Sequence, residues 1–150
     1  MCPGMVDVSE KKPCVRIAVA EGVIRLTKES VERIKEGRIE KGDIITASTI
    51  AASIAVKNTP LLIPLAHNIP IEWVGVEHEF LDDTRIKVRV TVKTTAKTGV
   101  EMDALAGVVG ALLTIWDMVK KYEKDEKGQY PHTAIESVRV AEKIKEEARA

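Results

Sequence analysis

The strongest constraint on the fold is a run of alternating side chains near the middle of the chain. Between Arg85 and Thr94 every second residue is apolar: Ile86, Val88, Val90 and Val92 alternate with Lys87, Arg89, Thr91 and Lys93. Successive side chains of a strand point to opposite faces, so this pattern predicts a strand with one buried and one wet face. Residues 74–80 also alternate and 81–84 can turn the chain, which predicts an antiparallel hairpin.

Helical spacing and capping residues predict three helices. Thr27 can cap a short polar helix that Gly37 ends, and Asp43 can cap a second helix over residues 44–57, whose alanines allow close approach to another backbone. The longest helix extends to about Tyr122, because apolar residues recur there at helical spacing: Met102, Leu105, Val109, Leu112, Leu113, Trp116 and Val119.

Two further strands are expected near the ends of the chain. Residues 16–21 have strand character that Gly22 ends, with residues 23–26 as a continuation. Three apolar residues suggest a last strand: Ile135, Val138 and Val140. The pattern of residues 137–145 fits a helix equally well.

The remaining segments are expected to be irregular. Residues 1–14 read as a flexible arm, and residues 142–150 read as a charged tail. Three prolines between Pro60 and Pro70 should prevent regular structure, so we expect an apolar loop that holds His67 in a constrained position.

The order of these elements predicts an α+β fold. Strand, helices, two strands, helix and strand is the order of a ferredoxin-like, split β-α-β sandwich, in which helices cover one face of an antiparallel sheet. A chain of 150 residues with 45% hydrophobic content suits one domain over residues 1–150. Valines on both faces of a small sheet further suggest that part of the open face is buried against another subunit.

Composition excludes several classes of protein. Lys and Arg total 23, as do Asp and Glu, so the overall field favours neither nucleic acid nor a membrane surface. The two cysteines, Cys2 and Cys14, lack the paired spacing of a zinc site and suit incidental thiols in a reduced compartment, so we expect no metal. No cofactor is expected either. Without a leader or a membrane span, a soluble cytoplasmic protein is the expectation.

The long helix carries the first candidates for chemistry. A stripe of small or polar residues steps along it by three or four: Asp103, Gly107, Gly110, Thr114 and Asp117. This stripe resembles the wall of a cleft, and Lys120 is close enough to Asp117 for the carboxylate to hold the ammonium group for acid-base chemistry. An ordinary surface ion pair explains the same spacing.

A second group of candidates precedes and follows the predicted helix of residues 44–57. Lys41 and Gly42 lie where a helix N-terminus favours an anion such as phosphate, although Asp43 as a simple cap explains the segment equally well. Lys57 could contact an anion or only stabilise the C-terminal end of the helix. His67 could contact a ligand or have a structural role, whereas His78 alternates with the hairpin valines and is expected to pack in the core.

Five strings in order resemble the MoaC family, over about Met5 to Lys143. They are the segments 5–9 (MVDVS), 41–43 (KGD), 63–67 (IPLAH), 97–105 (KTGVEMDAL) and 113–120 (LTIWDMVK). The resemblance implies a ferredoxin-like subunit of a homo-oligomer, expected as a hexamer built as a trimer of dimers, with the active site between subunits. It implies conversion of 3′,8-cyclo-7,8-dihydro-GTP to cyclic pyranopterin monophosphate with release of pyrophosphate, a lyase step of molybdenum cofactor biosynthesis.

The resemblance also implies the roles of individual residues. Asp117, Lys41 and Lys120 match the catalytic positions, and the substrate-binding positions are matched by Leu65, Ala66, His67, Met102, Asp103, Glu101, Lys57 and Arg16. The chain departs from the family pattern in four places. Ala66 replaces the common Cys, Thr49 an Arg, and Asp103 a Glu, and a Gly-Gly-Lys-Ser-Gly tail is replaced by residues 143–148.

Two other classes of protein are compatible with the predicted fold. An RNA-recognition module shares the element order, but its sheet should carry stacking aromatics, and residues 85–94 contain none. A catalytically inert homologue that lost turnover with its tail is the second alternative. Retention of Lys41, Asp117 and Lys120 together argues against it.

Overall fold

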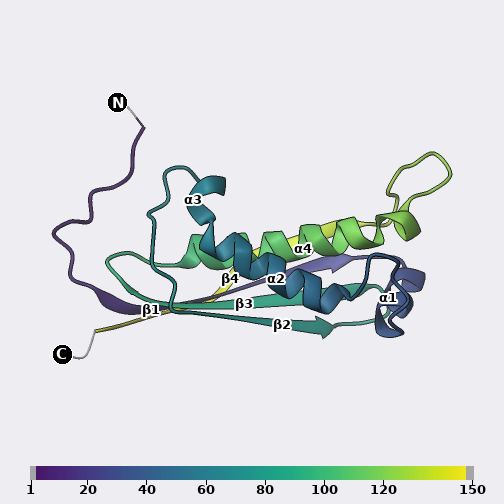
Figure 1. Cartoon of the computed structure of the whole chain (residues 1–150), viewed down its shortest axis with the longest axis horizontal. Helices are drawn as coiled ribbons and strands as arrows, with labels where there is room; N and C mark the ends of the chain where they lie inside the picture. The colour runs from purple at the N-terminus through teal and green to yellow at the C-terminus, as the bar shows by residue number, and fades with distance from the viewer. Residues whose placement is uncertain (1–2, 148–150) are drawn as a thin grey trace.

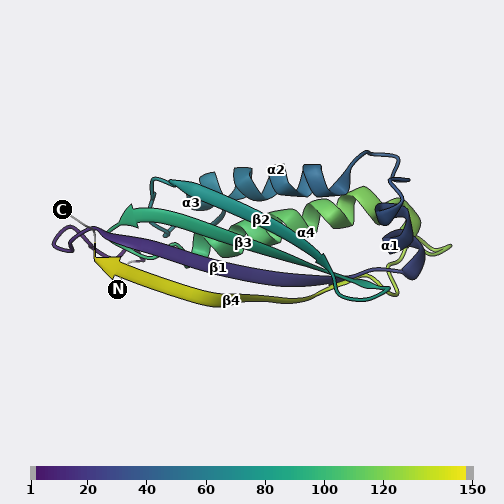
Figure 2. The ribbon, with the colours of Figure 1, turned by 90° about the horizontal axis from the view of Figure 1, so that it is seen from below.

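The computed structural model describes residues 3–147 and shows a four-stranded antiparallel sheet with helices on one face (Figure 1). The elements are β1 (Cys14–Arg25), α1 (Lys28–Lys35), α2 (Ile44–Lys57), α3 (Thr59–Leu62), β2 (Trp73–Phe80), β3 (Arg85–Ala96), α4 (Glu101–Glu123) and β4 (Ala134–Glu147). The strand order is β2-β3-β1-β4, and each neighbouring pair is antiparallel (Figure 2). This arrangement confirms the predicted ferredoxin-like fold.

The core lies between the sheet and the helices α2 and α4. The apolar residues of β3 face the helices and are fully buried, as are their partners from β1 and α4: Ile86, Val88, Val90, Val92, Ala20, Ile24, Val108, Leu112 and Ile115. Gly22 does not end the first strand, because β1 continues through it to Arg25. A side chain at Gly22 would lie 2.7 Å from Val108 Cγ1, so the glycine lets α4 pack closely on β1.

The small-residue stripe of α4 is a packing surface and not the wall of a cleft. A Cβ atom at Gly107 would lie 2.8 Å from Val56 Cγ2, and one at Gly110 would lie 2.9 Å from Ala55 Cβ. The glycines therefore allow α2 and α4 to approach each other closely. Only the two ends of the stripe, Asp103 and Asp117, remain as candidates for chemistry.

The open face of the sheet is polar along β3, as the sequence predicted. The outward residues of β3 alternate with its buried valines and are basic or hydroxylated: Lys87, Arg89, Thr91 and Lys93. On the helical side of the molecule, several large apolar side chains are exposed: Ile50, Ile54, Leu61, Leu62 and Leu113. The wet face predicted for β3 is confirmed, and the suggestion that another subunit covers part of the open face stays a prediction.

Three irregular segments contain more structure than expected. Despite Pro60, the short helix α3 occupies residues 59–62, because proline is tolerated in the first turn of a helix. Cys14 belongs to β1, and residues 142–147 of the expected tail belong to β4, which pairs with β1 along its whole length. Residues 1–2, with Cys2, and residues 148–150 lie outside the described part of the chain.

The last segment is a strand and not a helix because of its pairing with β1. Register shifts between Val19 and Ala20 and between Val23 and Ile24 interrupt the alternation of β4, so its apolar residues are not spaced by two. The helix α4 is long and apolar enough to cross a membrane by length and composition, but much of it is buried against the sheet and α2 as a core helix.

Candidate active site

Lys41, Asp117 and Lys120 form one cluster where α4 approaches the loop before α2. Lys41 Nζ donates to Asp117 Oδ2 at 2.8 Å and to the backbone oxygen of Asp117 at 3.1 Å, and Lys120 Nζ lies 3.0 Å from Asp117 Oδ1. The Lys120 contact comes from i,i+3 spacing on the helix, whereas Lys41 is 76 residues distant in sequence. The carboxylate therefore holds two ammonium groups at once.

The cluster is ionised and open to solvent. Hydrogen bonds from Lys41 and then Lys120 lower the pKa of Asp117, and the hydrogen bond with Asp117 raises the pKa of Lys120. The side chains of Lys41, Asp117 and Lys120 are 46%, 55% and 43% exposed. Two cations around one anion leave a net positive charge beside a cavity of about 380 Å³ that all three residues line. An anionic ligand could bind there, and the ammonium groups could donate protons to it.

The position of Lys41 follows from the turn that carries it. Gly42 N–H donates to Ile39 O at 3.0 Å, and Gly42 has a φ of +116°, which glycine adopts without strain. Asp43 then caps α2, because its side chain accepts from Ile45 N–H and from Thr46 Oγ1. The cap prediction for Asp43 is confirmed, and the Lys41 side chain points to Asp117 and not to the N-terminus of α2.

A second group of predicted site residues surrounds the N-terminal end of α4. Met102 is exposed, whereas Asp103 and Arg16 are buried, with 4% and 6% of their surfaces exposed. Arg16 Nη2 donates to Lys97 O at 3.3 Å, and the buried Arg16 Nε has no hydrogen-bond partner among residues 3–147. A buried guanidinium with a free donor can bind a polar ligand atom that reaches it.

Glu101 and Asp103 lie two residues apart but have opposite pKa shifts. Burial alone would raise the pKa of Glu101, but a hydrogen bond from Lys143 and the nearby charge of Arg16 hold that pKa below its usual value. Lys143 Nζ lies 2.5 Å from Glu101 Oε1. Burial raises the pKa of Asp103 to about 6, opposed in part by the Thr59 hydroxyl. A carboxyl group whose pKa lies near neutrality can exchange a proton at physiological pH.

Lys143 is a polar residue that the sequence did not single out. It lies in β4 opposite Ala18, and its contact with Glu101 joins the last strand to the start of α4. The sequence could indicate Lys143 only through the alternation of inward and outward residues in β4, and the register shifts of β4 against β1 obscure that alternation. Lys143 lies within residues 142–150, the segment expected from the sequence to be a charged tail.

The loop that carries Leu65, Ala66 and His67 lies at the same end of the molecule. His67 Nε2 is 2.7 Å from Val6 O, so the histidine contacts the N-terminal arm. His67 and Lys97 both line a cavity of about 300 Å³ that the arm borders through Val8. Lys57, at the exposed end of α2, precedes this loop.

His78 lies apart from both groups. It faces the helices from β2, and its Nε2 atom is 2.7 Å from the buried Ser48 Oγ of α2. Burial lowers the pKa of His78. These contacts agree with the expected packing role.

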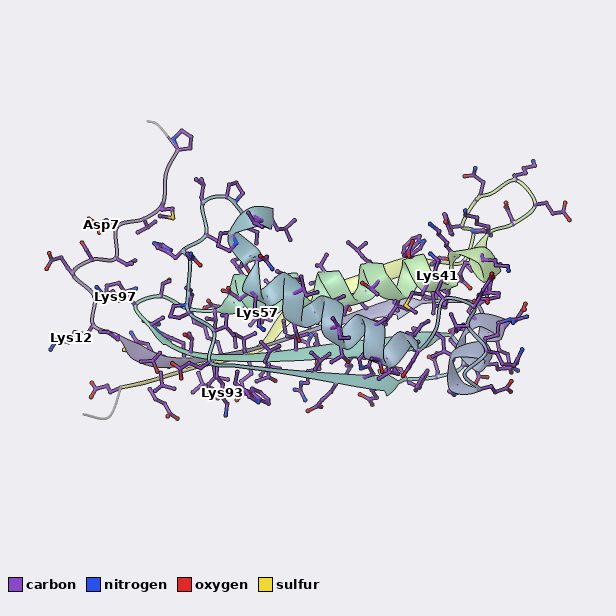
Figure 3. The ribbon with its side chains drawn as sticks, viewed as in Figure 1. Asp7, Lys12, Lys41, Lys57, Lys93 and Lys97 are labelled. Carbon is purple, nitrogen blue, oxygen red and sulfur yellow. The ribbon has the colours of Figure 1, made fainter. Side chains whose placement is uncertain are left out.

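The predicted site residues therefore fall into two groups within one chain. Asp103 and Asp117 are separated by about 21 Å along α4 at 1.5 Å per residue. Figure 3 shows Lys41 toward one end of the molecule and Lys97 at the other, with Lys57 between them. We call these the Lys41 end (Lys41, Asp117 and Lys120) and the His67 end (Arg16, Lys57, Leu65–His67 and Glu101–Asp103).

Comparisons with known proteins agree with the resemblance in the sequence. The MoaC family model matches residues 5–146. A protein of Aeropyrum pernix named "Probable cyclic pyranopterin monophosphate synthase" is 59% identical over 142 residues, which cover 95% of this chain and 97% of that protein. Proteins of the same name from Sulfurisphaera tokodaii and Archaeoglobus fulgidus are each 55% identical over 141 residues, covering 94% of this chain and 93% and 90% of theirs. With a match of this length and identity, the chain belongs to the MoaC family.

Proposed function

We propose that this chain is a cyclic pyranopterin monophosphate synthase, the activity for which its relatives are named, and that it acts in molybdenum cofactor biosynthesis. The observation that carries the assignment is the Lys41–Asp117–Lys120 cluster in a chain that matches the family from residue 5 to residue 146. By the family resemblance its substrate is 3′,8-cyclo-7,8-dihydro-GTP. Its products are then cyclic pyranopterin monophosphate and pyrophosphate.

The chemistry of the Lys41 end suits this reaction. A triphosphate needs cations, and Lys41 and Lys120 provide two within reach of one cavity. Ring rearrangement needs a proton donor and a proton acceptor, and by the family resemblance Lys41, Asp117 and Lys120 occupy the catalytic positions. Asp117 orients both lysines, because each donates to a different oxygen of its carboxylate.

The His67 end suits recognition of the purine-derived ring. The ring offers N–H groups, which carboxyl groups such as those of Glu101 and Asp103 can accept, and His67 and Arg16 can donate hydrogen bonds to oxygen atoms. A separation of about 21 Å between Asp103 and Asp117 is too long for one small molecule to contact both in the same chain. The complete site is therefore shared, with the Lys41 end of one subunit facing the His67 end of another.

A two-fold dimer would satisfy this requirement. If the helices of two copies lie antiparallel, the Lys41 end of each copy meets the His67 end of the other, and two equivalent sites form. The exposed apolar residues Ile50, Ile54 and Leu113 lie on α2 and α4 between the two ends and could be covered by such a contact. The family resemblance extends this to a hexamer built as a trimer of dimers, in the cytoplasm.

An assay with the cyclised GTP derivative tests the activity. The purified chain should release one pyrophosphate for each cyclic pterin formed. Failure to form either product with folded protein would support the inert homologue, in which replacement of the family's Gly-Gly-Lys-Ser-Gly tail by residues 143–148 abolished turnover.

Mixing two inactive variants tests the shared site. Lys41→Ala and His67→Ala remove opposite ends, so a mixed dimer would hold one doubly altered site and one intact site. Coexpression should restore roughly a quarter of the parent turnover with random pairing. Coexpressed Lys41→Ala and Asp117→Ala, which alter the same end, serve as the matched control and should restore none. Equal turnover in both mixtures would contradict a shared site.

A further inference from the structure

The turn that carries Lys41 is held against α4 by contacts outside the cluster itself. The turn spans Ile39 to Gly42, so Glu40 and Lys41 are its central residues. It lies between α1 and α2, at the end of the molecule where α4 terminates (Figure 1). Residues 36–43 belong to no helix or strand, so the main chain at Lys41 depends on the turn and on its neighbours.

Three pairs of residues join Glu40 and Lys41 to the last turns of α4. Asp117 accepts from Lys41, Lys121 forms an ion pair with the Glu40 carboxylate, and the hydroxyl oxygen of Tyr122 accepts from the Glu40 backbone N–H at 3.0 Å. The first two contacts join side-chain heads that are 46% to 68% exposed. Exposed pairs of long side chains constrain a main chain weakly.

The Tyr122 contact differs because it holds a backbone atom. The Tyr122 ring is half-buried and packs against the core, and the Arg33 guanidinium lies 4.5 Å from the ring centroid, so the core and Arg33 both hold the ring. A fixed hydroxyl bound to Glu40 N–H sets the position of the main chain one residue before Lys41. Lysine has a flexible stem, so the place of its ammonium group depends on where its Cα lies.

We propose that Tyr122 is a positioning residue for Lys41, and that its hydroxyl holds the turn so that the Lys41 ammonium reaches Asp117 and the substrate. The proposal rests on the proposed function, in which Lys41 acts at the reacting centre. Displacement of a catalytic group by about 1 Å can cost up to about 100-fold in rate. Loss of the Tyr122 hydroxyl should therefore affect turnover although Tyr122 itself need not touch the substrate.

The Tyr122→Phe variant removes only the hydroxyl and retains the ring that packs against the core and Arg33. We expect kcat to fall between about 10-fold and 100-fold, with a smaller change in KM, because Lys120 and the substrate contacts of the His67 end are unaltered. Ser53→Ala is the matched control, since among residues 3–147 Ser53 Oγ donates only within α2, to Thr49 O at 3.1 Å. It should retain the parent kcat. A parent-like kcat in folded Tyr122→Phe would overturn the proposal.

A titration of Asp117 separates positioning from general destabilisation. Hydrogen bonding by Lys41 is the largest cause that lowers the Asp117 pKa. Carboxyl carbon NMR should therefore show a higher Asp117 pKa in Tyr122→Phe than in the parent. In a Lys41→Ala background, Tyr122→Phe should produce no further rise. An equal rise in both backgrounds would overturn the proposal, because Tyr122 would then act independently of Lys41.

The same variants distinguish this proposal from the assignment of Lys41 itself. If Lys41→Ala retained the parent turnover, the catalytic role of Lys41 would be wrong. The titration would still report whether Tyr122 holds Lys41 on Asp117, because it measures the contact and not the reaction.

Discussion

At the C-terminal end of α4, Asp117 is 55% exposed and two lysines lower its pKa, whereas near the N-terminal end Asp103 is 4% exposed and burial raises its pKa to about 6. The same helix thus carries one carboxylate that stays charged and one that titrates near neutrality. The two carboxyl groups differ in their access to water and in their partners. Asp117 has two cations and contact with solvent, whereas Asp103 is buried from water. The first environment suits the binding of phosphate groups, and the second suits a carboxyl group that exchanges a proton near neutral pH.

The largest expected effect is on turnover at the exposed end. Asp117→Ala or Lys120→Ala should lower turnover by roughly 10²–10⁴-fold, because each removes part of a positioned acid-base pair. The double variant should cost little more than either single one, since groups that act together are not additive. Single-turnover product formation measures all three. Near-parent turnover in either single variant would reduce the cluster to a surface ion pair and remove the contrast between the ends.

The buried end should show its largest effect in stability. Asp103 has a folded-state pKa of about 6 and an ordinary value of 3.8, so above pH 6 the folded state carries a buried charge that costs about 3 kcal/mol. The sign follows from proton binding. Between pH 3.8 and 6 the folded state binds more protons than the unfolded state, so stability falls as pH rises through this window.

Asp103→Asn should therefore stabilise the protein at pH 7 while it lowers turnover. The amide carries no charge, so the variant avoids the cost that the parent bears above pH 6. Denaturant unfolding at pH 7 and at pH 3.5 measures the difference, which should shrink toward zero at the lower pH. A variant less stable than the parent at pH 7 would show that Asp103 is better satisfied than its burial indicates.

The sequence predicted those features that depend on neighbouring residues. The predicted first and last residues of α2 are confirmed, because Asp43 caps its first turn and Asn58, Thr59 and Pro60 follow its last residue. The β3 strand was also correct, since its alternation is uninterrupted. Local chemistry fixes these boundaries, so a single sequence contains the information.

Features that depend on distant partners were harder to predict. The alternation of β4 is broken by its register shifts against β1, which lies more than 100 residues away, so its last residues were read as a tail. The contact between Lys41 and Asp117 joins residues 76 apart, and spacing could suggest only Lys120 as a partner. The position of Lys41 before α2 suggested a phosphate contact, and the family resemblance placed Lys41 with Asp117 and Lys120 among the catalytic positions. No local signal indicated that the predicted residues would divide between two ends of one chain.

The smallest predicted effect concerns Lys143, which distinguishes the two carboxyl groups of the buried end. Lys143→Gln removes the positive charge that pairs with Glu101, and Lys143 is 55% exposed, so the loss at pH 7 should be only about 0–1 kcal/mol. Here the sign is opposite to that of Asp103. The folded-state pKa of Glu101 lies below 4.5, so the pair contributes stability above that pH and loses it as pH falls through the folded-state value.

The two variants should therefore differ from the parent in opposite directions at pH 7. Lys143→Gln should be less stable than the parent and Asp103→Asn more stable, and both differences should shrink toward zero at low pH. Chemical denaturation of the three proteins across pH 3 to 8 measures both trends, and the same sign for both variants would show that the two carboxyl groups share one environment.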